Sequence, residues 1–217
     1  MTHFYPHTYE FFERLQKRNP HPETELTYTD PYTLLVAVVL SAQSTDKGVN
    51  KATESLFQVA NTPEKMVDLG IEGLKKYIKT IGLYNNKAKN IIGLSRLLIE
   101  RHNGQVPSDR ISLEALPGVG RKSANVVLSV AFHQDTFPVD THMFRVCNRT
   151  GLAPGKTPKD VERTLEAIVP PPFRHHAHHW IVLHGRYICT AIKPKCMICP
   201  ISDLCDYYQT RAQCAIL

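Results

Sequence analysis

Two short runs in this chain hold residues that could do covalent chemistry on a polyanion. The first, Leu116–Ser123 (LPGVGRKS), places Lys122 after a glycine-rich turn and at the start of an apolar helix. The second, Val139–His142 (VDTH), places Asp140 directly before the next helix. Exposed N–H groups of such a turn suit a phosphate, and a lysine at a positive helix end is a candidate amine nucleophile. Lys122 and Asp140 are therefore the candidate catalytic residues.

Both residues also have a purely structural interpretation. A lysine in a first helical turn is on most helices a solvated surface residue. Here the helix start and Arg121 both disfavour a further positive charge, which makes the neutral amine of Lys122 more accessible. Asp140 occupies an ideal N-cap position. Its two roles are compatible, because a capping carboxylate stays ionised and an anion beside a sugar stabilises positive charge as a base leaves.

The glycine turn has the pattern of a helix–hairpin–helix motif. Gly118 and Gly120 flank Val119 between a short predicted helix and a longer one. Glycines let the backbone approach a phosphate closely, in a contact that is independent of base sequence. A nucleotide-binding P-loop is excluded, because its spacing needs glycine where Ala115 stands and lysine where Arg121 stands.

Cysteines are crowded near the end of the chain. Four of the six lie within residues 189–205, namely Cys189, Cys196, Cys199 and Cys205. Clustered thiolates select zinc, copper(I) or an iron–sulfur centre. Only one Cys-x2-Cys pair is present, which is less typical of a zinc ribbon, although the spacing leaves zinc open. The basic loop with Lys193 and Lys195 is either a phosphate contact or an ordinary solvated loop.

Other metal-binding residue types have plainer interpretations. Cys147 lies on a helical run and is expected to be a buried small apolar residue. Cys214 is expected to be an incidental thiol in a loosely held tail after Cys205. The histidines of residues 175–179 lack a nearby carboxylate or cysteine pattern, so surface histidines are favoured over a metal site.

Length and composition indicate an ordinary globular protein. The 217 residues are 42% hydrophobic and 21% charged, with a formal net charge of +6 that favours polyanion contact. The N-terminus lacks the pattern of a signal peptide. The longest apolar run, Leu34–Leu40, is too short to span a bilayer and predicts a buried helix. We therefore expect no membrane association.

Helical periodicity dominates, and no segment shows convincing strand alternation, so the sequence predicts an all-α fold. Threonine–proline pairs at 62–63 and 157–158 have the pattern of helix starts. Junctions are expected near 19–22, 133–138 and 153–156. Helices are predicted near residues 7–18, 31–42, 46–60, 63–69, 71–80, 84–102, 112–116, 120–133, 140–149, 158–169 and 174–188.

Taken together, the motifs resemble those of endonuclease III, the bifunctional DNA glycosylase and abasic-site lyase family of the helix–hairpin–helix superfamily. The resemblance runs from about Asn19 to Cys205. It rests on ordered motifs at 116–122 (LPGVGRK), 139–142 (VDTH), 40–43 (LSAQ) and 81–85 (IGLYN), together with the four-cysteine spacing.

The resemblance implies an all-α fold in two lobes. Residues 24–134 would form a six-helix barrel containing the helix–hairpin–helix motif at about 112–133, and residues 1–23 with 135–217 would form a second lobe carrying a [4Fe–4S] cluster. The four clustered cysteines would be its ligands. The implied partner is double-stranded DNA with damaged bases or abasic sites. A monomer is expected, in the cytoplasm and at the nucleoid if the source is bacterial.

The resemblance also implies a role for each motif residue. Lys122 would be the Schiff-base nucleophile and Asp140 would assist base loss and proton transfer. Gln43 would fill the space left by a flipped nucleotide, and Leu83 would wedge into the opposite strand, because an unstacked duplex is costly unless something replaces the base. The residues expected to contact the DNA backbone are Gly118, Gly120, Arg121, Lys193 and Lys195. Oxidised or ring-saturated pyrimidines are the implied substrates.

Three other functions remain open at this point. An adenine-mismatch glycosylase shares the hairpin, the aspartate and the cysteine spacing, but usually lacks the lysine and carries an extra C-terminal domain. A non-enzymatic DNA-binding module would not need Lys122 together with Asp140. An electron-transfer iron–sulfur protein would not need the hairpin.

Overall fold

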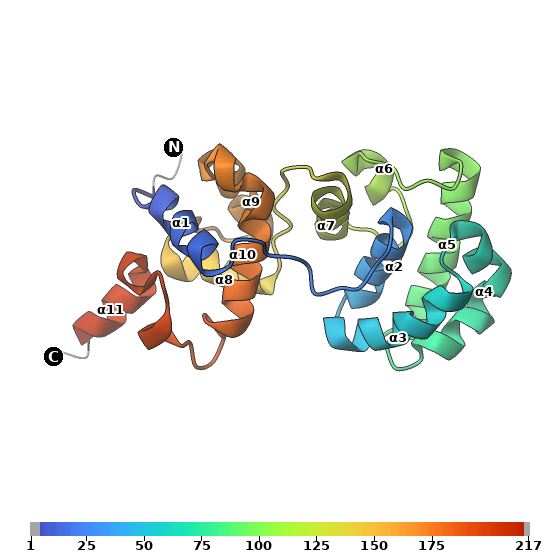
Figure 1. Cartoon of the computed structure of the whole chain (residues 1–217), viewed down its shortest axis with the longest axis horizontal. Helices are drawn as coiled ribbons and strands as arrows, with labels where there is room; N and C mark the ends of the chain where they lie inside the picture. Colours follow the sequence, from blue (N-terminus) through green and yellow to red (C-terminus); the bar gives the residue numbers. More distant parts are fainter. Residues whose placement is uncertain (1–4, 215–217) are drawn as a thin grey trace. The chain divides into compact units, whose positions relative to one another are not determined.

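The computed structural model describes residues 5–214, with only the backbone of the last four, and within that range it contains helices and no strand (Figure 1). The all-α prediction is therefore confirmed. The chain divides into two compact units, which we describe separately. The central unit is Thr24–Gln134, and the terminal unit combines Met1–Glu23 with Asp135–Leu217. None of the described helices has the length and apolar character needed to cross a bilayer.

The central unit, every residue of which is described, is built from six helices around an aliphatic core. Helix α2 is its centre, because each of its residues from Tyr32 to Leu40 is buried and it packs against α3, α5 and α7. The buried helix predicted there is confirmed. The six helices are α2 (Pro31–Ser41), α3 (Asp46–Val59), α4 (Pro63–Ile78), α5 (Tyr84–His102), α6 (Arg110–Glu114) and α7 (Arg121–Phe132).

Two boundaries in this unit are informative. Gly70 has a φ of 67° and a ψ of 173° inside α4, so the chain breaks there into two helical segments, as the sequence predicts. Helix α6 begins at Arg110, two residues before the predicted start, because the Asp109 carboxylate accepts the N–H of Ser112 at 2.9 Å. Hydrogen bonding to Ser112 also lowers the pKa of Asp109.

Four helices of the central unit start at a conventional N-cap. The caps of α2, α3, α4 and α6 are, in that order, Asp30, Thr45, Thr62 and Asp109, and each accepts a backbone N–H through its side chain. The starts of α5 and α7 differ. Their N-cap residues are Leu83 and Gly120, neither of which makes a side-chain capping bond. Both lie in motifs that the family resemblance links to DNA.

The terminal unit has a core rich in aromatic rings. Phe12 stacks on Phe173 with ring centroids 5.8 Å apart, and Trp180 meets Phe173 edge-on at 6.1 Å. Trp180 also donates its indole N–H to the carbonyl of Asn19 at 2.7 Å, which ties the first segment of this unit to its last helices. Its α-helices are α1 (Thr8–Arg18), α8 (Thr141–Thr150), α9 (Pro158–Ile168), α10 (Arg174–Tyr187) and α11 (Asp206–Cys214).

The tail after Cys205 differs from its prediction. Residues 206–214 form helix α11, which packs against α8, so the expectation of a loosely held tail is wrong there. The contact is close, since a Cβ added to Gly151 would lie 2.0 Å from the Asp206 carboxylate. Gly151 ends α8 with a φ of 79°. The Cys214 side chain and residues 215–217 lie outside the described part, whereas Cys147 is fully buried as predicted.

The histidine run also differs from its prediction. On helix α10 His175 is exposed, but His178 is 7% exposed and His179 is partly buried, so surface placement is wrong for this pair. Their rings meet at 5.1 Å. Burial lowers the pKa of His179 to about 4, which keeps its ring neutral at ordinary pH.

Candidate active site and cysteine pocket

The glycine hairpin joins α6 to α7 and is fixed by α5. Gly118 has a φ of 79°, and a Cβ there would lie 2.8 Å from the amide nitrogen of Asn90 on α5. Only glycine meets both conditions without displacing Asn90. Gly120 is different, because its backbone is extended and a Cβ there would meet nothing within 4 Å. The backbone beside Gly120 is thus open to a ligand.

Lys122 projects from the first turn of α7. It is exposed, as is Arg121 beside it, whereas the following residues from Ala124 to Ser129 are buried against the core of the central unit. Because Gly120 has no side chain to cap the helix, it supplies no acceptor for the first-turn N–H groups. An exposed amine therefore stands beside a helix end that attracts anions.

Asp140 belongs to the terminal unit and is the N-cap of α8. One of its carboxylate oxygens accepts the N–H of Met143 at 2.8 Å, and the residue is half-buried. The capping interpretation of Asp140 is therefore confirmed. Lys122 and Asp140 lie on different units, each at the start of a helix.

Gln43 and Leu83 lie on two neighbouring loops of the central unit. Both are exposed, Leu83 by 57%, and both have left-handed backbones with φ of 56° and 60°. A Cβ on Gly82 would lie 3.5 Å from the carbonyl oxygen of Gln43, so the two loops are in contact. Positive φ is rare for residues with long side chains and concentrates at functional sites. The structure brings together these two residues, which the sequence separates widely.

The four clustered cysteines line one pocket of the terminal unit, and no disulfide joins them. His184 and Pro194 also line the pocket, and the turns η2 (Cys196–Ile198) and η3 (Ser202–Leu204) each contribute their first residue to its lining. Burial raises the pKa of the Cys199 thiol to about 11 and also raises that of Cys205. Such thiols ionise against a strongly positive centre such as a metal cluster.

Arginines hold this cysteine segment through its backbone. Arg149 donates to the carbonyls of Thr190 and Ala191, both at 2.8 Å, and lies 3.6 Å from the sulfur of Cys189. Arg145 donates to the Cys189 carbonyl at 2.9 Å.

Two arginines of α1 hold the same segment: Arg14 donates to the carbonyl of Pro200, and Arg18 donates to the carbonyl of Ile198. No local sequence pattern predicts these contacts, because each arginine and its partner lie far apart along the chain.

The donor set fits an iron–sulfur cluster better than a single ion. Among the described residues, no three His, Cys, Asp or Glu side chains converge closely enough to hold one metal ion. Four thiols spread around a pocket instead match a [4Fe–4S] cluster, which takes four cysteine ligands. Thus the pocket fits the cofactor predicted from the sequence.

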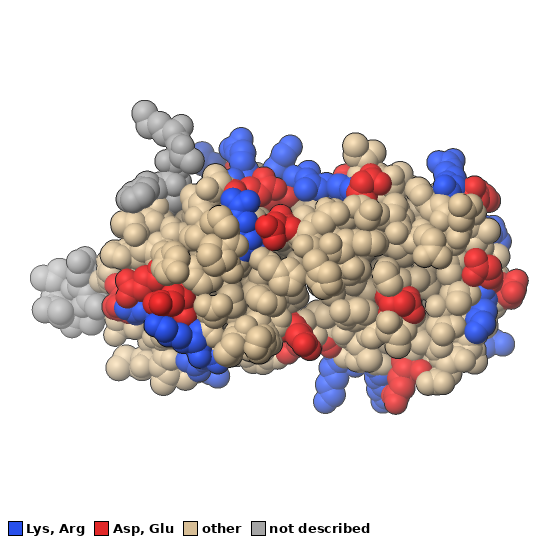
Figure 2. Space-filling view, turned by 45° about the horizontal axis from the view of Figure 1, so that its top comes forward, with Lys and Arg blue, Asp and Glu red and all other residues tan. Residues whose placement is uncertain are grey.

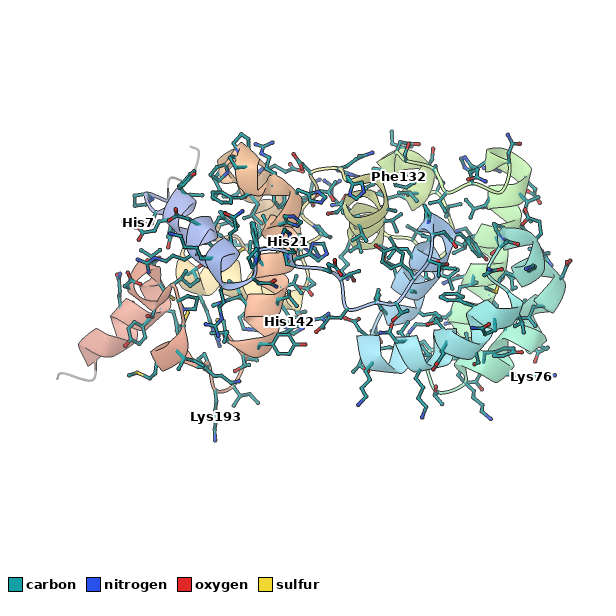
Figure 3. The ribbon with its side chains drawn as sticks, viewed as in Figure 1. His7, His21, Lys76, Phe132, His142 and Lys193 are labelled. Carbon is teal, nitrogen blue, oxygen red and sulfur yellow. The ribbon has the colours of Figure 1, made fainter. Side chains whose placement is uncertain are left out.

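The loop between the first two clustered cysteines is basic and exposed. Lys193 points away from the ribbon of the terminal unit (Figure 3), and Lys195 is also exposed. Thr190 donates to the Lys193 carbonyl at 2.7 Å, which fixes the loop. On the face seen in Figure 2 most residues are uncharged, and Lys and Arg side chains stand beside Asp and Glu. The net positive charge therefore forms no continuous patch on that face.

Comparison with protein families defines the class of this chain. Residues 36–171 match the HhH-GPD superfamily of base excision DNA repair proteins. Residues 189–205 match the iron–sulfur binding domain of endonuclease III. The second match begins at Cys189 and ends at Cys205, the outer two of the four cysteines that line the pocket.

Similarity to individual proteins narrows the class. Endonuclease III of Escherichia coli (strain K12) is 61% identical over 198 residues, which cover 91% of this chain and 94% of that protein. A non-covalent endonuclease III–DNA complex superposes with a TM-score of 0.89 at 43% identity, covering 94% of this chain and 96% of the other. A trapped endonuclease III–DNA covalent intermediate gives 0.87 at 44%, covering 93% and 95%. The chain belongs to the endonuclease III family, base excision repair enzymes that combine DNA glycosylase with abasic-site lyase activity and carry a [4Fe–4S] cluster.

Proposed function

We propose that Lys122 is the nucleophile of this enzyme. Its amine attacks C1′ of the damaged nucleotide, the bond from C1′ to the base breaks, and the base leaves with a proton. The C1′–O4′ bond then breaks, O4′ takes up a proton as the sugar ring opens, and the nitrogen forms a Schiff base with C1′ that makes the C2′ hydrogen acidic. Loss of that proton expels the 3′ phosphate and nicks the strand.

One observation carries this assignment: Lys122 is exposed in the first turn of a helix whose N-cap is a glycine with open backbone around it. A DNA phosphate bound by the hairpin would hold the adjacent sugar near the amine. Gly118, Gly120 and Arg121 supply that backbone contact. Burial of the next residues of α7 keeps the helix, and so Lys122, in a fixed position.

Asp140 acts as the anion beside the sugar. Its bond to the Met143 N–H fixes the carboxylate at the start of α8. In that position it stabilises positive charge that develops on the sugar as the base leaves, and it takes part in the proton transfers.

Gln43 and Leu83 replace the flipped nucleotide in the duplex. Their side chains are exposed on adjoining loops, as an insertion of two neighbouring groups into one base-pair gap requires. Gln43 fills the gap and Leu83 wedges into the opposite strand. Lys193 and Lys195 contact the phosphate backbone from the cysteine segment.

Cys189, Cys196, Cys199 and Cys205 hold the [4Fe–4S] cluster. When bound, the cluster supplies a structural crosslink among these segments rather than a reactive group. The Lys193 to Lys195 loop lies between the first two ligands, so the cluster also fixes the loop for DNA binding.

The proposed substrates are oxidised or ring-saturated pyrimidines and abasic sites in double-stranded DNA. The protein acts as a monomer, and one chain carries both the glycosylase and the lyase activity. Bacterial relatives with the same activity support a place of action at the chromosome, in the cytoplasm.

Borohydride trapping tests the nucleophile directly. The wild-type protein is expected to form a covalent adduct with duplex DNA that contains an abasic site, because borohydride reduces a Schiff base to a stable amine. Lys122→Gln should abolish the adduct and leave DNA binding within about threefold, since one charge among many phosphate contacts is lost.

Lys76→Gln is the matched control, since Lys76 is an exposed lysine near the end of α4 (Figure 3). It should trap as the wild type does. If the Lys122→Gln protein, with its cluster intact, still forms the adduct, the nucleophile is another residue.

A further inference from the structure

Lys87 is a buried lysine in the first turn of α5, and only 4% of it is exposed. It lies on the apolar face of that helix, among residues such as Ile91 and Leu94 that are fully buried. A lysine is almost never buried unless it is paired, so its partners indicate why it is there.

The partners of Lys87 all lie at the end of α2 and in the loop that follows. Its ammonium group donates to the carbonyls of Leu40 at 2.9 Å and Ala42 at 2.6 Å, and to the hydroxyl of Ser44 at 3.0 Å. Each of the three N–H groups of the ammonium thus donates a hydrogen bond to one oxygen, and these bonds compensate for burial of the charge. The Leu40 carbonyl belongs to the last turn of α2 and Ala42 is the C-cap of that helix, a position where carbonyls lack helical partners and a cation is favoured.

The loop itself is a type II turn with Gln43 in the strained position. The Ser44 N–H donates to the Ser41 carbonyl at 3.0 Å, Ala42 has φ of −56° and ψ of 117°, and Gln43 has φ of 56°. A type II turn requires positive φ at its third residue and favours glycine or asparagine there. Glutamine would fit a type I turn better, in which its φ is negative.

Types I and II differ by a flip of the central peptide, here the one that joins Ala42 to Gln43. The Ala42 carbonyl points in opposite directions in the two forms. Its hydrogen bond to Lys87 exists only in the type II orientation. Lys87 is therefore the group that selects the strained form of the turn.

We propose that Lys87 is a positioning residue for base flipping, which locks the Ala42–Gln43 peptide and so sets the direction of the Gln43 side chain. This inference rests on the proposed function, since it assumes that Gln43 enters the duplex. Lys87 lies four residues after Leu83, in the first turn of the same helix, so it also ties the Leu83 loop to the Gln43 loop. The two loops then present their side chains together.

Single-turnover base excision tests the proposal with the full-length holoenzyme. On duplex DNA with an oxidised pyrimidine, Lys87→Met and Gln43→Ala should each slow excision about tenfold, because a misplaced positioning group loses orientation. The double variant should be no slower than Gln43→Ala alone, since both changes remove the same group from the gap. Lys87→Arg, which keeps the donors, should restore most of the rate.

Two readouts separate positioning from a general structural role. Fluorescence of 2-aminopurine placed opposite the lesion should show less base flipping in Lys87→Met. Borohydride trapping on a single-stranded abasic site, which needs no flipping, should stay within about twofold of the wild type. Ser44→Ala removes one acceptor only and gives a milder variant; it should show a smaller effect in the same direction.

Three results would overturn the inference. If Gln43→Ala is slow while Lys87→Met and Ser44→Ala are not, Gln43 has its proposed role but Lys87 does not position it. If the two effects multiply in the double variant, or trapping on single-stranded DNA falls as much as excision, Lys87 acts elsewhere in the fold. If Gln43→Ala itself has no effect, the proposed role of Gln43 fails and the inference fails with it.

Discussion

The two units of this protein are held together in different ways. In the central unit, aliphatic side chains from all six helices form one continuous core, with Leu35 and Leu74 among those fully buried. In the terminal unit, an aromatic core supports the helices, but the cysteine segment beyond α10 contains only short turns. Ile192 and Met197 in that segment are 89% and 88% exposed.

That difference shows where each unit obtains its stability. Burial of apolar area stabilises the central unit without any ligand. The cysteine segment buries Ile201 and Leu204 in the core of the terminal unit but leaves Ile192, Met197 and Ile198 exposed, so we expect it to depend also on arginine bonds to its carbonyls and on the cluster that we propose its thiols hold. We therefore expect the loop of Lys193 and Lys195, which we propose contacts DNA, to depend on the cluster, and the Lys122 hairpin to be independent of it.

The strongest test of this contrast is removal of the cluster. Cys199→Ser should eliminate the visible absorbance of the protein, because a four-thiolate site loses one ligand. Hydrogen exchange should then become fast in residues 189–205 and stay slow in α2 and α7. Equal loss of protection in both units would contradict the proposed difference between them. Cys147→Ser, outside the pocket, is the matched control for cysteine replacement.

Truncation of a core side chain in the central unit should lower the stability of the protein and leave the cluster in place. Leu35→Ala removes a fully buried side chain from α2 and should lower the free energy of unfolding by about 3 kcal/mol. Denaturation followed by circular dichroism should shift to lower denaturant. The visible absorbance in the absence of denaturant should not change; a bleached Leu35→Ala protein would show that the cluster needs the central core.

Acid should weaken the terminal unit through a buried histidine. His179 has a pKa of about 4 in the folded protein, and an unfolded histidine titrates near 6.5. Between these values the unfolded chain binds a proton that the folded chain excludes, so stability falls as the pH falls from about 6.5 to 4. At pH 5 the loss is about 2 kcal/mol.

Denaturant unfolding at pH 7 and pH 5 measures this effect. His179→Gln should lose about 2 kcal/mol less stability than the wild type over that interval. His175→Gln, at an exposed position of the same helix, should behave as the wild type does. Identical pH dependence of the His179→Gln and wild-type proteins would rule His179 out as the acid-sensitive group.

The smallest effect is expected at an exposed apolar position of the cysteine segment. Ile192→Ser should change the free energy of unfolding by no more than about 0.5 kcal/mol, because its side chain is almost fully exposed. The rate of cluster loss, followed by visible absorbance, should also stay the same. A large change in either quantity would mean that packing of the Ile192 side chain contributes to this segment.

Local patterns predicted most of the helices, and long-range contacts explain what they missed. The hairpin, the buried α2 and the break in α4 follow from glycines and apolar periodicity in short windows. The role of Lys87 could not be predicted, since its acceptors lie more than forty residues earlier in the chain. The one available signal was a lysine on the apolar face of α5. The predicted start of α6 is two residues late because the prediction does not include Asp109 as the N-cap.

The histidine pair and the last helix were misjudged for the same physical reason. The histidines are predicted at the surface because no metal-ligand pattern lies near them, and the polar tail is predicted to be loosely held. Neither argument includes tertiary packing, which buries His178 and places α11 on α8. The roles of Lys122, Asp140, Gln43 and Leu83 stay predictions, although the structure confirms the helix starts and loops on which they depend.

The contact between Gly151 and Asp206 limits which sequences can keep the last helix. A side chain at 151 would collide with the Asp206 carboxylate and would also strain the left-handed backbone that ends α8. Position 151 and helix α11 are therefore expected to change together in evolution. Chains that end soon after their fourth cysteine should tolerate asparagine at this position, whereas chains with a docked terminal helix should keep glycine.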